Sequence, residues 1–314
     1  MGILDRAVER ARASLITSAT GPFAHGSYPL ADSLRYQGDP GLFGPGSVSW
    51  RVIGDVAAFE GGIRALFVQS AHPEVVAGVE QHSRYREDPL GRLARTSAYV
   101  TATTFGAMPE VEEAVARVRR AHRVVAGFSH RGLPYSADAP ALSAWVHNAL
   151  TDSFLRCYQE FGPARLTEGE ADQFVAEQSR VGRLLDADPL PATAAELAEW
   201  VEWHPHLAPS PGMDDAVEFL RRPPLETPGQ KVGYQIMQGA AVATLPERLR
   251  KVLAVESRPG ALPAGRALIA GLRWALGMSP SWNLALVRVG APVPPGLFRQ
   301  PLPPPGAGAT GRAV

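Results

Sequence analysis

The segment APALSAWVHNALTDSFLRCYQEF, residues 139–161, is apolar on nearly every side when it is placed on an α-helix. Its apolar residues include Leu142, Trp145, Val146, Leu150, Phe154, Leu155 and Cys157. An amphipathic surface helix keeps one polar face, whereas a helix that is apolar all round is buried. The segment therefore predicts a central helix around which the rest of the chain packs.

The polar residues of this segment include two pairs at helical spacing. His147 and Thr151 are four positions apart, and so are Asn148 and Asp152. Residues with that spacing are neighbours on a helix, so each pair can form a hydrogen-bond network in the core. Two roles stay open: bracing the core, or orienting the ligand of a cofactor.

Helical periodicity covers most of the remaining chain, which predicts an all-α fold. The expected helices cover residues 50–69, 73–82, 89–105, 109–126, 139–161, 168–185, 194–203, 214–221, 230–243 and 262–276. The N-cap candidates are Ser47 or Ser49, Asp88, Asp138, and Thr167 with Glu170 three positions later. No pair of alternating apolar runs indicates a β-hairpin. We expect an N-terminal helical extension at 1–25, one multi-helix domain at 26–288, and a Pro/Gly-rich disordered tail at 289–314.

Composition excludes several classes of protein. The 314 residues carry 31 basic and 31 acidic side chains, so no charge excess indicates a nucleic-acid partner. The single cysteine, Cys157, excludes an intrachain disulfide and a thiolate metal cluster, and we expect a buried core residue. Residues 1–20 lack the apolar core of a signal peptide, and no apolar run reaches the roughly 20 residues of a spanning helix. These features predict a cytoplasmic protein without an integral membrane segment.

The segment PLGRLARTSAYV, residues 89–100, gathers polar side chains on one side of an expected helix. Arg92, Arg95, Thr96 and Tyr99 are spaced three or four positions apart. A solvent-facing helix surface would explain the charge, but it would not explain this mixture of residue types.

Two further helices carry unusual residues. His122 falls in the apolar stripe of the helix expected at 109–126, where it is either a core residue with satisfied ring nitrogens or the ligand of a haem iron or another transition metal. The helix expected at 50–69 carries small residues at Gly54, Ala57, Ala58, Gly61 and Ala65. Since glycine inside a helix costs about 1 kcal/mol relative to alanine, this row should admit a close neighbour, more readily a crossing helix than a flat ligand.

Several ordered motifs together resemble the oxygenase family that includes fungal MpaB and the bacterial rubber oxygenase. The motifs are GPGSVSW (44–50), GDVAAFEGGIRALFVQSAHP (54–73), HS (82–83), DPLGRLARTSAYV (88–100), AHRVVAG (121–127), YSADAP (135–140) and WVH (145–147). The similarity is close over residues 40–165 and weaker at RWALGMSPSW (273–282). It implies an all-α, globin-like core around haem b, with dioxygen as cosubstrate.

The resemblance also implies roles for individual residues. The rubber oxygenase has an R-x-x-K-T pattern on the distal side of its haem, and this chain matches it at Arg92 and Thr96. Arg95 replaces the lysine, and because arginine offers no lone pair it should not cap the iron. His122 corresponds to the proximal iron ligand, with His147 or a backbone carbonyl as its partner. Glu80 and Glu87 are candidates for the distal general base.

The sequence thus predicts a haem b-dependent oxygenase that uses dioxygen on a lipophilic small molecule. Iron held by His122 would bind oxygen on the side of Arg92, Arg95 and Thr96, although either arginine is also able to pair with a haem propionate. The alternatives are a haem-binding sensor or carrier without turnover, and a cofactor-free helical binding protein. His204 and His206 are too close together for a metal pair on one helix, so we expect no metal there. The sequence does not decide the oligomeric state, the substrate, or whether the C-terminal helices form a lid.

Overall fold

The computed structural model describes residues 12, 30, 32–83, 87–225 and 227–302, and most of these are helical, which confirms the all-α class. The elements before the hairpin are η2 (Ser33–Arg35), α2 (Val48–Gly54), α3 (Ala57–Ser70), α4 (Pro73–His82), α5 (Pro89–Phe105) and α6 (Met108–His122). The hairpin consists of β1 (Ala126–Phe128) and β2 (Pro134–Ser136). It is followed by α7 (Pro140–Phe161), α8 (Glu168–Arg183), α9 (Ala194–Glu202), α10 (Pro211–Arg221), α11 (Pro228–Ala243), α12 (Glu247–Val252), α13 (Ala261–Leu276) and α14 (Pro280–Val289).

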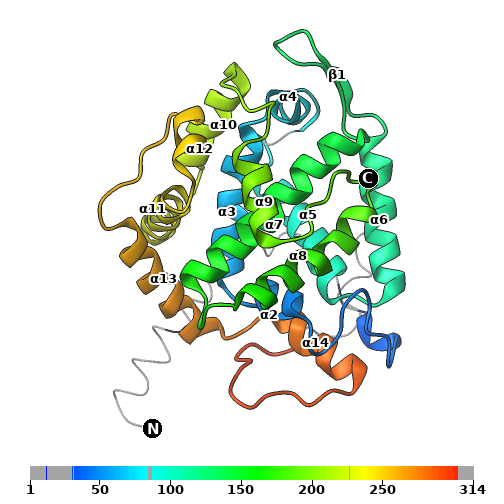
Figure 1. The fold of residues 1–314 in the computed structure, drawn as a ribbon. Helices are drawn as coiled ribbons and strands as arrows, with labels where there is room; N and C mark the ends of the chain where they lie inside the picture. The colour runs from blue at the N-terminus through cyan, green and yellow to red at the C-terminus, as the bar shows by residue number, and fades with distance from the viewer. Residues whose placement is uncertain (1–11, 13–29, 31, 84–86, 226, 303–314) are drawn as a thin grey trace.

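The centre of the molecule is the packing of α7 against α3 (Figure 1). Trp145 and Phe154 of α7 are buried, and Cys157 is a buried free thiol, so the predicted central helix and core cysteine are confirmed. Around this pair, α11 packs on α3 and α13, α8 and α9 cover α7, and α6 packs on α5.

A glycine and a buried ion pair set the distance between α3 and α7. A Cβ atom added to Gly61 would lie 2.6 Å from Phe154 Cδ1 and 3.0 Å from Phe154 Cα. One turn further on, Arg64 Nη1 donates to Asp152 Oδ2 at 2.7 Å and to Ser153 Oγ at 2.8 Å. Arg64 and Asp152 are both buried. The small residues expected to admit a crossing helix therefore do so at Gly61.

The single helix predicted at 50–69 is wrong in one respect, because the structure divides it into α2 and α3. Asp55 lies at the break, where its carboxylate accepts the Ala57 N–H at 2.8 Å. Arg273 holds the same carboxylate from α13 with two hydrogen bonds of 2.6 and 2.7 Å. A local hydrogen bond to the Asp55 carboxylate and a distant arginine thus stabilise the break between the two helices.

The helix predicted at 109–126 ends earlier, at His122, and the chain then forms the hairpin that the sequence did not indicate. Its strands pair antiparallel, with Gly127 opposite Tyr135. Each strand has three residues, which is too short for an alternating pattern to stand out. Helices α12 and α14 were also not predicted.

The predicted N-caps are confirmed at Ser47, Asp88 and Thr167, whose side chains accept backbone N–H groups, and Thr167 forms the expected capping box with Glu170. Asp138 is not an N-cap, because α7 begins one residue later, after Ala139. The N-terminal extension, apart from Arg12, and the last part of the predicted tail, 303–314, lie outside the described residues. Before that point Phe298 packs edge-on against Trp282, with ring centroids 5.6 Å apart.

We predict that Gly61→Ala destabilises the protein by about 1–3 kcal/mol, because the new methyl group forces α3 away from the backbone of α7. Gly271→Ala in α13 is the matched control, since its Cβ meets nothing within 4 Å and gains helix propensity without a clash. Urea unfolding followed by circular dichroism measures both. Equal stability changes in the two variants would contradict the close packing at Gly61.

Candidate functional site

A cavity of about 630 Å³ lies beside α3 and α5, within the size range of small-molecule binding pockets. Its wall is mostly apolar and includes Leu66, Val76, Leu93, Phe105, Phe154 and Phe219. Ala58, Gly62 and Ala65 of α3 also line it, and a Cβ added to Gly62 would meet nothing within 4 Å. The row of small residues on α3 therefore serves two purposes: Gly61 admits α7, and the others leave the cavity open.

Arg92 and Thr96 bring polar chemistry to this cavity from α5. The Thr96 hydroxyl donates to the Arg92 carbonyl at 3.2 Å, so both residues lie along one edge of the helix. Thr96 is exposed as well as lining the cavity, which places it where the cavity meets solvent. Arg92 and Thr96, which the sequence analysis singled out, thus line the same mostly apolar cavity.

Arg95, unlike Arg92 and Thr96, does not line the cavity. Its side chain is 65% exposed, and its Nη1 lies 3.3 Å from Asp88 Oδ2. Tyr99 is half-buried, and burial raises its pKa. Neither of the two candidate bases lines the cavity either, and both Glu80 and Glu87 are exposed.

His122 lines a separate pocket of about 180 Å³ at the end of α6. Arg119, Arg123 and Asp138 share that pocket, so its surroundings are charged. Burial lowers the pKa of His122, with Asp138 opposing the shift, which favours the neutral imidazole. His122 and Arg92 therefore line different pockets.

His147 packs into the interface of α7 with α8. Its Nε2 lies 3.4 Å from Thr151 Oγ1, and the Thr151 hydroxyl also donates to the His147 carbonyl at 2.9 Å. The first of the two predicted polar pairs is therefore in contact. The second pair has other partners: Asn148 donates to the Pro189 carbonyl at 3.1 Å, and Asp152 accepts from Arg64.

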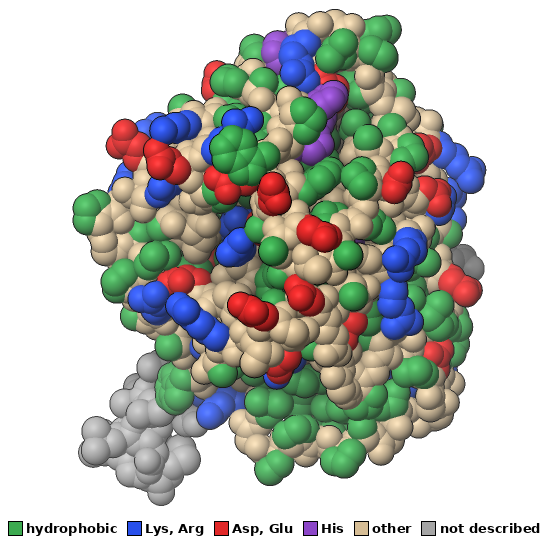
Figure 2. Space-filling model, in the orientation of Figure 1, with side chains coloured by type: hydrophobic (Ala, Val, Ile, Leu, Met, Phe, Trp, Pro, Cys, Tyr) green, Lys and Arg blue, Asp and Glu red, His purple; other side chains and the backbone are tan. Residues whose placement is uncertain are grey.

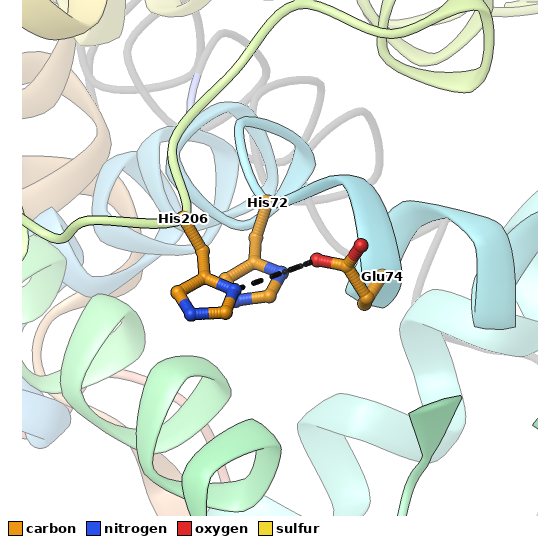
Figure 3. Close-up of side chains that lie close together, drawn as sticks. All are labelled: His72, Glu74 and His206. Carbon is orange, nitrogen blue, oxygen red and sulfur yellow. Dashed lines mark ion pairs between the residues drawn. The ribbon is translucent and has the colours of Figure 1, made fainter. Parts of the chain in front are cut away.

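A third group of residues was missed by the sequence analysis. His72 precedes α4, Glu74 lies in its first turn, and His206 follows α9; their side chains converge in Figure 3. One ligand atom from each lies within 4.8 Å of the others, which makes the trio a candidate metal-binding group. The signal was present in two short motifs, His-Pro-Glu at 72–74 and His-Pro-His at 204–206.

A comparison with protein families gives one finding that bears on this arrangement. The family model for "ER-bound oxygenase mpaB/B'/Rubber oxygenase, catalytic domain" matches residues 50–274. The chain belongs to this oxygenase family. A comparison with curated proteins gives no significant match, and neither does a comparison with solved structures.

The match of the mpaB/rubber oxygenase family covers the His72 group, the pocket of His122 and most of the residues that line the cavity, whose lining also includes residues after 274. In the described part of the chain, no helix combines the length and the apolar character needed to cross a bilayer. The resemblance inferred from the motifs is thus confirmed at the level of the family.

We predict that His147 makes stability fall with acidity. Burial lowers its folded-state pKa to about 4 from 6.5, so below pH 6.5 the unfolded chain takes up a proton that the folded protein does not. Between pH 7 and pH 5 this difference costs on the order of 2 kcal/mol, and the loss levels off below the folded pKa. Urea unfolding at both pH values should show a smaller loss in His147→Gln than in the wild type.

The control for this measurement is His130→Gln, because His130 is exposed. Its pH dependence should equal that of the wild type. A His147→Gln protein that loses as much stability at pH 5 as the wild type would show that His147 is not held neutral by the fold.

Proposed function

We propose that this oxygenase-family protein uses dioxygen to oxidise an apolar small molecule bound in the cavity beside α3 and α5. The observation that carries the proposal is the cavity itself: about 630 Å³, mostly apolar, and bordered by the polar side chains of Arg92 and Thr96. Such a chamber favours a lipophilic ligand, because apolar surface gains free energy when it leaves water.

We propose that two residues of the cavity wall, Arg92 and Thr96, stabilise the negative charge that develops on oxygen during the reaction. A guanidinium stays protonated at any physiological pH and offers several N–H donors, and a threonine hydroxyl offers one more. Donors beside an apolar chamber stabilise negative charge that develops on oxygen more strongly than they would in water. Arg95 is not part of this proposal, because it faces solvent and Asp88.

The identity of the cofactor stays a prediction: the family resemblance implies haem b held by His122. The residues described here do not fit such a haem in the cavity, because none of the residues that line it is a histidine, cysteine, methionine, tyrosine or lysine. His122 itself lies in the other, charged pocket. Haem held by His122 would therefore not occupy the cavity as it is lined here.

An absorption spectrum of the wild type and of His122→Ala, both expressed with haem precursor, tests this point directly. A Soret band that weakens or shifts in His122→Ala would support haem held by His122, and a colourless wild type would contradict it.

We predict that filling the cavity at Gly62 blocks ligand binding. Gly62→Phe directs a ring into open space, so it should weaken binding of the neutral apolar probe N-phenyl-1-naphthylamine by about 10-fold or more. Gly271→Phe is the control, because Gly271 also has open space but lies on α13 away from the cavity lining. Fluorescence titration measures both, and equal affinities in the two variants would contradict the assignment of the cavity.

We predict that turnover depends on Arg92 and not on Arg95. With a panel of apolar alkenes and phenols, oxygen uptake and incorporation of ¹⁸O from labelled dioxygen should fall on the order of 100-fold in Arg92→Met. Arg95→Met, three residues away on the same helix, should match the wild type. An Arg92→Met protein that oxidises a substrate at the wild-type rate would exclude Arg92 from the reaction.

A further inference from the structure

His72, Glu74 and His206 come from two segments that are far apart in the chain. The Nδ1 atom of His72 lies 3.4 Å from Glu74 Oε2, and the Nδ1 atom of His206 lies 3.8 Å from the same oxygen. The two imidazole rings are stacked, with centroids 5.4 Å apart and an angle of 12° between their planes. Figure 3 shows both rings turned toward the carboxylate. Three donor atoms therefore converge on one small volume.

The first reason to expect a ligand there is an unsatisfied atom. His72 is 2% exposed, and its Nδ1 is buried without a hydrogen-bond partner. Buried polar atoms in native proteins nearly always have partners, since leaving one unpaired costs about 1–3 kcal/mol. A neutral imidazole in this position is able to offer its Nδ1 lone pair to a metal ion. A bound metal ion would satisfy this nitrogen.

The second reason is that Glu74 is held in place by residues behind it. Arg131 donates to both carboxylate oxygens, at 3.2 and 2.6 Å, and the Ser129 hydroxyl donates at 2.9 Å. Burial raises the pKa of Glu74, but these hydrogen bonds outweigh it and leave the pKa below its ordinary value. Carboxylates that bind metal ions are commonly oriented by such outer hydrogen bonds. Because Arg131 also brings positive charge, we expect micromolar rather than nanomolar affinity.

The third reason is geometry. Metal–ligand distances of about 2.0–2.2 Å place neighbouring donor atoms roughly 3–3.5 Å apart, so His72 and Glu74 already have the required separation. His206 has to approach the other two residues, because its Nδ1 lies 3.8 Å from Glu74 Oε2 and the three ligand atoms are within 4.8 Å of one another. Its side chain is 53% exposed, so a neighbouring core does not hold it in place. Figure 2 shows histidine side chains reaching the surface in the upper part of the molecule. The site thus has a path for the ion and a coordination position open to water.

His204 lies beside this group without belonging to it. Its ring packs against Trp145 and Trp200, with centroids 4.8 and 4.7 Å away, and its Nδ1 accepts the His206 backbone N–H at 3.4 Å. These contacts hold His204 as part of the wall around the trio.

We propose that His72, Glu74 and His206 bind one divalent first-row transition-metal ion, such as Zn²⁺ or Fe²⁺. Two neutral imidazoles and one carboxylate are the donor set that both ions accept in proteins. None of the three residues lines the apolar cavity, so the proposal does not depend on the proposed function. The ion would join α4 to the chain after α9, and through Glu74 to the β1–β2 turn.

The test uses the full-length chain after treatment with a chelator and removal of the chelator by gel filtration. Calorimetric titration with Zn²⁺ alone, and visible absorption after addition of Co²⁺ alone, should show one ion per chain. A rise in melting temperature with Zn²⁺ should accompany binding, because a ligand of the folded state stabilises it. His206→Ala and Glu74→Gln should each weaken binding at least 10-fold and abolish the Zn²⁺-dependent rise.

His130→Ala is the matched control, because His130 is an exposed histidine between the two residues that hold Glu74; it should bind like the wild type. His206 is half-exposed, so His206→Ala keeps a folded protein to measure even where Glu74→Gln does not. The absence of Zn²⁺ binding to the wild type, or binding to His206→Ala with wild-type affinity, would overturn the proposal. The Zn²⁺ titration does not depend on binding of the apolar probe, so the outcome of the Gly62→Phe experiment would leave it unaffected. The metal site and the cavity are therefore tested separately.

Discussion

The close crossing of α3 and α7 is the constraint on which the other parts of the molecule depend. Gly61 allows the backbone of α7 to approach, and the buried ion pair between Arg64 and Asp152 fixes the register one turn away. Removing one partner of such a pair leaves an uncompensated buried charge, which costs about 3–5 kcal/mol. With α3 held in place by α7, Gly62 and Ala65 of α3 line the cavity. The same helix therefore organises the core and shapes the chamber.

Helix positions could be predicted from the sequence because local signals mark their ends. Helices α4 and α5 begin at Pro73 and Pro89 as expected, since proline is favoured in the first turn and Asp88 caps the second of them. The predicted helix boundaries are wrong where contacts between residues far apart in the chain determine the structure. The division of the segment at Asp55 depends on Arg273, which lies 218 residues further along the chain. No local pattern carries that information.

The candidate site, like the helices, could be predicted from the sequence only in part. Spacing placed Arg92, Arg95 and Thr96 on one side of α5, but successive residues turn by about 100°, so Thr96 lies roughly 40° from Arg92 and Arg95 roughly 60° in the opposite direction. The edge of the cavity falls between them, and only a neighbouring helix decides where that edge lies. His72 and His206 are still harder to connect, because they are 206 − 72 = 134 residues apart. The expectation of no metal at His206 considered only a helix, whereas the structure places it in a loop facing α4.

The junction between α3 and α4 lies between the apolar cavity and the proposed metal site. Gln69 and Ser70 line the cavity before the junction, and Val75 and Val76 line it afterwards, whereas His72 lies between them and does not. Because Glu74 and the two valines share the first turn of α4, a displacement of that turn changes the cavity wall and the proposed metal site together. An ion bound at the trio would hold the turn against the chain after α9 and so restrict how far this wall can move. The short segment from residue 69 to residue 76 therefore contributes both to the cavity wall and to the proposed metal site.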